Sequence, residues 1–133
     1  KHLARAILES NAFAIRFYLT LMETMKAKCS EIRVDGGGSK SSLWNQIICD
    51  VNGKTVIVPK ATEGSALGAA ILAATGASVY GSVGEAIKNM VHFVEKKEPN
   101  KECLLAYNKM YTTFQNLVMT TYLAKRVTGD IVV

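Results

Sequence analysis

Three consecutive glycines, Gly36 to Gly38, separate a strand-like run from a helix-like run. In such an arrangement the loop amides and the N-terminus of the helix can face an anionic or polar ligand, which comes close because no side chain obstructs it. The helix dipole adds only about 0.3 to 1 kcal/mol with a nearby negative charge, so shape and contact must supply most of the affinity. A structural turn with positive φ fits the triplet equally well, and the pattern alone leaves both interpretations open.

Two common phosphate-binding patterns fail at these glycines. A Walker loop requires G-x-x-x-x-G-K-[ST], but Lys40 does not directly follow Gly38, and Arg33 occupies the position of the first glycine. The dinucleotide fingerprint G-x-G-x-x-G is met by Gly36 and Gly38 and fails at its last position, where Ser41 stands. Both patterns are therefore excluded.

Four acidic residues are candidates for proton transfer or metal binding, and we expect none of them to act as a catalytic base. Asp35 precedes the glycines and is expected to hold the loop. Asp50 is expected on the exposed side of its helix, and Asp130 lies in the tail. Glu63 stands just before a helix, where its charge favours the helix N-terminus.

The cysteines and histidines do not form a recognisable site. Cys29, Cys49 and Cys103 are widely spaced and odd in number, which fits neither a disulfide framework nor a zinc pattern. His2 and His92 have no ligand-spaced neighbour, so we expect no metal site. The free thiols indicate a reducing, cytoplasmic setting.

Composition limits the class of protein. At 133 residues and 49% hydrophobic content, the chain can bury one sizeable core. The net charge of +5 is scattered along the chain, so we expect no nucleic-acid partner. The longest uncharged, apolar-leaning run, residues 110–124, is too short and too polar to span a bilayer, and no signal-peptide layout is present. We therefore expect no membrane partner.

Helical and strand-like patterns alternate along the chain. The residues in 92–98 fit a strand or a loop. The expected elements are a helix over 2–27, a strand over 32–35, a helix from Ser41 or Ser42 to Asn52 and Gly53, a strand over 55–58, a helix over 64–75, a short helix opened by the Ser82 and Glu85 capping box and running through Val91, and a closing helix after Pro99 that Gly129 ends. This order predicts an α/β fold in which the two strands are neighbours in a short parallel sheet.

Four blocks in this order resemble the C-terminal part of the FGGY carbohydrate kinases: "HLARAILE", "VDGGGSKSSLWNQIICDV", "VPKATEGSALGAAILA" and the closing helix with its tyrosines. The resemblance covers nearly the whole chain. It implies a helix-rich part of a ribonuclease-H-like lobe of the actin and hexokinase type, with MgATP and sugar bound between two lobes. Residues 1–133 would be the C-terminal portion of the second lobe, with the N-terminal lobe and the start of the second lobe absent.

The resemblance also implies a nucleotide site. Gly36, Gly37 and Gly38 match a segment that lies against the adenosine and the α-phosphate, and Gly37 and Gly38 match its backbone contacts. Ser41 matches a position where the glycerol kinases of the family place an asparagine near the adenine. Because serine is shorter, we expect a water-bridged contact there.

Three further residues near this segment have two interpretations. Gly64 and Gly68 belong to a helix that resembles the one behind the pocket, so their lack of a side chain serves packing or a ligand. Trp44 either anchors its helix by packing or borders the nucleotide with its ring edge.

The implied activity is ATP-dependent phosphorylation of a small sugar or polyol, with ATP and Mg²⁺ as cofactors. "GGGSKSSLW" resembles the xylulokinase and autoinducer-2 kinase branches, which favours a ketopentose such as xylulose. The catalytic aspartate of the family belongs to the absent lobe, so the resemblance implies no catalytic residue and no metal ligand here, and an inactive fragment. A homo-oligomer is expected for the intact enzyme. The alternative is a nonenzymatic actin-fold module that senses nucleotide or serves assembly.

Overall fold

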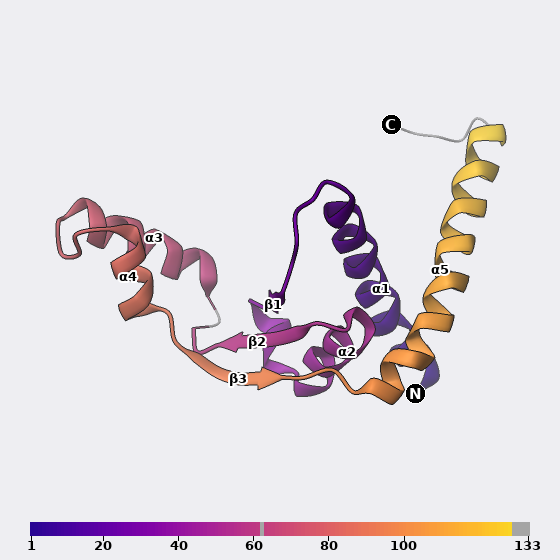
Figure 1. Ribbon diagram of the computed structural model, residues 1–133, viewed down its shortest axis with the longest axis horizontal. Helices are drawn as coiled ribbons and strands as arrows, with labels where there is room; N and C mark the ends of the chain where they lie inside the picture. The colour runs from indigo at the N-terminus through magenta and orange to yellow at the C-terminus, as the bar shows by residue number, and fades with distance from the viewer. Residues whose placement is uncertain (62, 129–133) are drawn as a thin grey trace.

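The computed structural model describes residues 1–61 and 63–128, with side chains as far as residue 122 (Figure 1). The expected end of the last helix at Gly129 and the tail residue Asp130 lie outside these ranges. The elements in chain order are α1 (His2–Thr24), β1 (Glu31–Arg33), the short 3-10 helix η1 (Gly37–Lys40), α2 (Ser42–Asn52), β2 (Thr55–Pro59), α3 (Gly64–Gly76), α4 (Val83–Met90), β3 (Phe93–Lys97) and α5 (Lys101–Thr128).

Local signals set several helix ends as expected. The Ser41 hydroxyl accepts a hydrogen bond from the Trp44 N–H at 3.2 Å and caps α2, which ends at Gly53 with φ at +61°. At α4 the Ser82 hydroxyl accepts from the Glu85 N–H at 3.2 Å, and the Glu85 carboxylate accepts from the Gly81 N–H at 2.8 Å. The predicted capping box is therefore confirmed.

The sheet has three strands in the order β1-β2-β3. β1 and β2 are parallel, with Ile32 opposite Val56, as the sequence predicts. The segment over 92–98, which the sequence left open between strand and loop, forms β3; it pairs antiparallel with β2 and places Lys96 opposite Ile57, so the sheet as a whole is mixed. The charged run in β3 has little strand propensity of its own, so pairing with β2 determines its conformation.

Helix α2 is the centre of the core because two of its faces are buried. One cluster joins α1, α2 and α5 through Ala12, Phe13, Ile47, Val51, Tyr107 and Tyr111. A second cluster joins α2 to the sheet through Ile48, Cys49 and Val56. The glycine segment enters α2 directly, so the best-packed helix of the chain supports it.

Asp50 corrects one expectation about α2. It was expected on the exposed side of the helix, yet it is only 6% exposed. Its Oδ1 accepts hydrogen bonds at 2.8 Å from the Gln46 Nε2 and from the Asn100 N–H at the start of α5. Packing of α5 against α2 buries this carboxylate, so its role is to join two helices.

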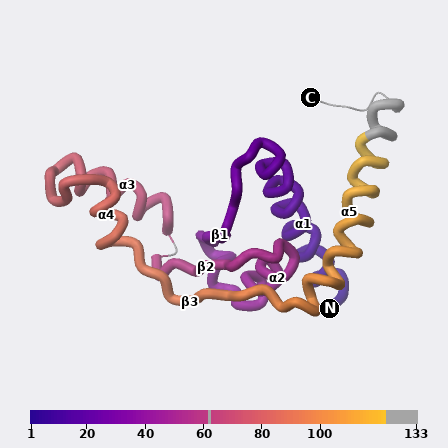
Figure 2. Tube along the Cα trace, viewed as in Figure 1, coloured from indigo at the N-terminus to yellow at the C-terminus, as the bar shows by residue number. Residues whose placement is uncertain are grey.

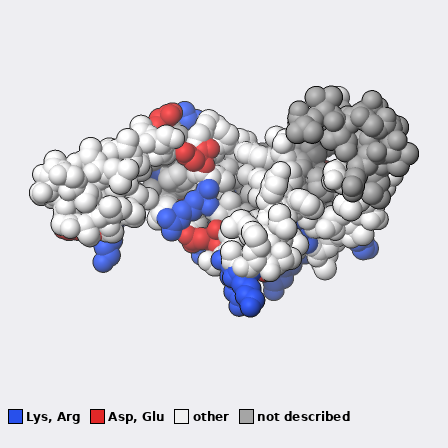
Figure 3. Space-filling model, turned by 90° about the horizontal axis from the view of Figure 1, so that it is seen from above, with Lys and Arg blue, Asp and Glu red and all other residues white. Residues whose placement is uncertain are grey.

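Helices α3 and α4 form a pair at one end of the molecule, away from α1, α2 and α5 (Figures 1 and 2). Ile71 of α3 and Ala86 of α4 are buried, whereas Leu72 and Val79 are about two-thirds exposed. On the face seen in Figure 3 this end carries few charged side chains, while acidic and basic side chains mix over the middle of the molecule. The pair therefore packs mainly on itself.

The buried thiol of Cys49 gives a testable pH dependence. Burial raises the pKa of Cys49 from the ordinary 9.0 to about 11, and its Sγ donates a hydrogen bond to the Lys97 carbonyl. Below about pH 9 the neutral thiol therefore contributes fully to stability, and this contribution is lost as the pH rises from 9 to 11. At pH 8 we expect iodoacetamide to modify the half-buried Cys29 and Cys103 and to spare Cys49, as read by mass spectrometry. Equal modification of Cys49 and Cys103 in the folded protein would contradict this burial.

Candidate functional site

The glycine segment has a fixed conformation. Gly36 has φ at +75° and ψ at −172°, a backbone region that is essentially restricted to glycine. Its carbonyl accepts hydrogen bonds from the Ser39 N–H at 3.1 Å and from the Ser39 hydroxyl at 2.7 Å. These bonds close the η1 turn, so the segment is a formed loop.

The other two glycines have no comparable backbone requirement. A Cβ on Gly37 would meet no atom within 4 Å, and a Cβ on Gly38 would make an ordinary 3.5 Å contact with the Trp44 ring. Both residues are exposed, and within residues 1–61 and 63–128 no acceptor pairs with their backbone N–H groups. Two donors without partners therefore stand on an exposed surface, with only glycine at their own positions and the Trp44 ring beside Gly38.

Two buried polar residues hold the loop from below. Ser39 is 3% exposed, and its carbonyl accepts a hydrogen bond at 2.7 Å from the Nδ2 of Asn45, which is fully buried. Sequence reasoning missed Asn45. Its only signal was a polar residue one position after Trp44, in the first turn of an otherwise apolar helix face.

Ser41 and Trp44 lie at the start of α2, beside the loop. The Ser41 hydroxyl accepts the capping bond from Trp44, so its own hydrogen is left to donate to another group. Trp44 is half-buried and packs against both core clusters, which confirms it as a packing anchor. The Nε1 edge of its ring faces Gly38.

Asp35 joins the loop to α3. Both of its carboxylate oxygens accept from the Gly64 N–H at 3.1 Å, so the contact that the structure shows for Asp35 is to the start of α3, where the sequence led us to expect one that holds the loop. Glu63 occupies the N-cap position of α3, but its side chain makes no capping bond. Gly64 is a close-approach position for Asp35, whereas a Cβ on Gly68 would meet nothing within 4 Å.

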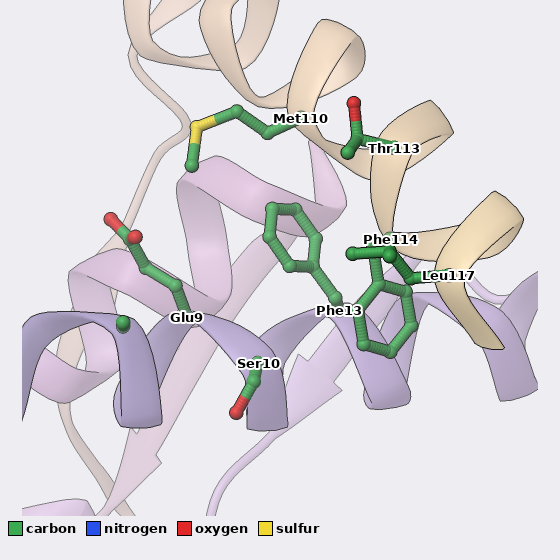
Figure 4. Close-up of a pocket in the computed structure, with 8 residues that line it drawn as sticks. Glu9, Ser10, Phe13, Met110, Thr113, Phe114 and Leu117 are labelled. Atoms are coloured by element: carbon green, nitrogen blue, oxygen red, sulfur yellow. The ribbon is translucent and has the colours of Figure 1, made fainter. Parts of the chain in front are cut away.

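An apolar hollow lies elsewhere, between α1 and α5 (Figure 4). Its volume is about 300 Å³, and its lining is mostly apolar: Ala6, Glu9, Ser10, Phe13, Met110, Thr113, Phe114 and Leu117. Near its rim the Tyr107 hydroxyl donates to Glu9 at 2.7 Å and accepts from Arg5 at 2.7 Å. Burial raises the pKa of Tyr107. This hollow has no element in common with the glycine segment.

Two kinds of site are not found among the described residues. No three Asp, Glu, His or Cys side chains in residues 1–61 and 63–128 gather closely enough to hold a metal ion. Across the same residues, none of the helices combines the length and hydrophobicity of a transmembrane span.

The fold and the loop define the class of protein. A sheet flanked by helices carries a loop at the carboxyl end of β1, which is where open α/β sheets bind their ligands. The C-terminal domain model of the FGGY family of carbohydrate kinases matches residues 1–77. The chain therefore belongs to the FGGY family of carbohydrate kinases.

Individual relatives agree with this assignment. The L-xylulose/3-keto-L-gulonate kinase of Escherichia coli (strain K12) is 32% identical over 117 residues, which are 88% of this chain and 24% of that protein. The autoinducer-2 kinase of Photorhabdus laumondii is 36% identical over 114 residues, which are 85% of this chain and 22% of that protein. The crystal structure of xylulose kinase from Rhodospirillum rubrum matches with a TM-score of 0.78 and 29% identity, covering 91% of this chain and 25% of that chain.

These matches establish the fold and the extent of the chain. FGGY sugar kinases have the actin-like and ribonuclease-H-like fold, and the mixed three-stranded sheet with its helices is part of such a lobe. The chain spans about a quarter of the length of these relatives.

Proposed function

We propose that residues 1–133 are the C-terminal portion of the second lobe of a longer ATP-dependent sugar or polyol kinase, called the parent kinase below. An N-terminal lobe and the start of the second lobe would precede these residues. The support is that the relatives are about four times as long as the matched segment and are named as kinases. We also propose that the parent kinase is a homo-oligomer and that it is cytoplasmic. The free cysteines support the cytoplasmic location, because reduced thiols are typical of that compartment.

In this proposal Gly36, Gly37, Gly38 and Ser41 line the adenosine side of the nucleotide site. The observation that carries it is the pair of N–H groups on Gly37 and Gly38, which are exposed and have no acceptor among the described residues, with the Trp44 ring beside Gly38. Donors of this kind suit an anionic or polar ligand. The Ser41 hydroxyl, which can still donate, is placed to reach the nucleotide directly or through a water.

This chain holds and orients the nucleotide but does not provide the catalytic base. The bonds from Ser39 and Asn45 fix the loop before the ligand arrives, so little ordering cost remains at binding. Bound Mg²⁺ neutralises charge on the phosphates during phosphoryl transfer. No cluster in the described residues could hold the ion alone, so its ligands are expected from the phosphates and the N-terminal lobe.

The preferred substrate is a ketopentose such as xylulose. The relatives include proteins named L-xylulose/3-keto-L-gulonate kinase and xylulose kinase, which supports this choice over glycerol. Autoinducer-2 kinases are about as similar, so a linear polyhydroxy compound is the broader class.

Turnover of ATP separates the fragment from the parent kinase. We expect the parent kinase to turn over MgATP in a xylulose-dependent way. The 133-residue chain should show no sugar-dependent turnover, because phosphoryl transfer needs a carboxylate that positions the attacking hydroxyl. A coupled ADP-release assay on both proteins, with glycerol as the comparison substrate, measures this. Activity of the chain alone would refute the missing-base proposal, and a parent protein that binds MgADP without any turnover would favour the nucleotide-sensing module.

A further inference from the structure

The α3 helix obtains its N-terminal cap from a distant part of the chain. Its own N-cap residue, Glu63, has φ at −113° and ψ at 68° and makes no side-chain capping bond. The first N–H of the helix, on Gly64, instead donates to both oxygens of Asp35 at 3.1 Å. Asp35 lies 29 positions earlier in the sequence and immediately precedes Gly36.

The contact requires a residue without a side chain at position 64. A Cβ on Gly64 would collide with the Asp35 carboxylate, well inside van der Waals contact. An alanine would therefore push the carboxylate away from the N–H that it accepts. The absence of a side chain at Gly64 is thus explained by this contact within the chain.

Little else joins the α3–α4 pair to the sheet. The backbone enters α3 after β2 and leaves α4 for β3, and the Lys60 N–H donates to the His92 carbonyl at 2.8 Å where these two connections meet. Apart from these connections, the hydrogen bonds from Gly64 to the Asp35 side chain are the contact that links α3 to the glycine segment among the described residues.

We propose that Asp35 is a positioning residue that couples α3 to the glycine loop, so that a change at either one is transmitted to the other. Asp35 does not contact the nucleotide in this scheme. It acts through Gly36, whose glycine-only backbone conformation turns the chain directly from Asp35 into η1. The expected change in the KM for ATP rests on the proposed function. The coupling between α3 and the glycine loop rests on the structure alone.

A double-mutant cycle in the parent kinase tests the coupling. We expect Asp35→Ala and Gly64→Ala each to raise the KM for ATP by about three- to tenfold, the size of a lost helix cap, with little change in kcat. The double variant should match either single variant and not their product, because both changes remove the same contact. Asp35→Asn retains an acceptor oxygen and should restore most of the affinity. Multiplicative effects would overturn the proposal.

Ser82→Ala is the matched control, since it removes an ordinary cap from α4 in the same helix pair. It should leave the KM for ATP unchanged. If Ser82→Ala raised this KM as much as Asp35→Ala does, the effect of Asp35→Ala would be explained by general destabilisation of the helix pair. Hydrogen exchange on the unliganded parent kinase gives a readout that does not depend on activity. Asp35→Ala should accelerate exchange both at residues 36–41 and at residues 64–67. Acceleration at only one segment overturns the coupling, whereas a wild-type protein that fails to use ATP overturns only the proposed function.

Discussion

Replacing Gly37 with leucine should raise the KM for ATP of the parent kinase by about tenfold or more, a loss of about 1.4 kcal/mol, with little change in melting temperature. The structure gives two reasons. A Cβ at Gly37 meets no atom within 4 Å, so the fold has room for a side chain to begin there, and a leucine would cover the N–H surface on which we place the nucleotide. Steady-state kinetics at saturating sugar, with a parallel thermal melt, measure both quantities.

Two other glycines serve as controls for Gly37. Gly76→Leu adds the same side chain at another position where a Cβ meets nothing within 4 Å, and it should leave the KM for ATP unchanged. Gly36→Ala should instead lower stability by about 1 to 3 kcal/mol, because an alanine is strained at φ +75° and ψ −172°. A Gly37→Leu variant with normal ATP affinity would remove this residue from the nucleotide site.

Truncating Phe13 should produce the largest stability loss in the chain. Phe13 is 5% exposed, and its ring centroid lies 6.0 Å from that of Tyr107 and 5.4 Å from that of Phe114, which joins α1 to α5. Phe13→Ala should therefore cost about 3 to 5 kcal/mol, since it removes buried apolar area and leaves a cavity. Calorimetry of the transition of the second lobe in the parent kinase measures the loss.

Tyr18→Ala provides the comparison for Phe13→Ala. Tyr18 is on the same helix and is 64% exposed, so its truncation removes little buried area. We expect less than about 1 kcal/mol for this variant, in the range of ordinary surface changes. Equal losses for the two variants would mean that the α1–α5 contact does not carry the stability we assign to it.

Rules that depend on near neighbours in the sequence predicted much of the fold. The caps at Ser41 and Ser82 and the αL ending at Gly53 each involve residues only a few positions apart. The parallel pairing of β1 with β2 followed from a strand, a helix and a strand in succession.

Contacts between distant residues were beyond those rules. β3 forms because β2 offers an edge for pairing, which the charged sequence of β3 does not reveal. Asp50 is buried because α5 arrives from about fifty positions later and donates the Asn100 N–H to it. In both cases tertiary packing decides the environment of residues whose local pattern is polar, which left β3 open and made the expectation for Asp50 wrong.

The candidate site shows the same division. The sequence singled out the three glycines, but only the structure separates Gly36, which needs positive φ, from Gly37, which does not. The support from Asn45 and the contact between Asp35 and Gly64 depend on how the loop, α2 and α3 meet in space. The blocks shared with the FGGY kinases identified the family, while the roles of individual side chains required coordinates.

The central claim is that Gly36 to Gly38 form the adenosine side of a kinase nucleotide site. A crystal structure of the parent kinase with MgADP and xylulose tests it most directly. We predict that backbone atoms of Gly37 and Gly38 lie within about 4 Å of the adenosine or the α-phosphate, the distance of van der Waals contact. A nucleotide bound elsewhere, with this loop still facing solvent, would contradict the claim.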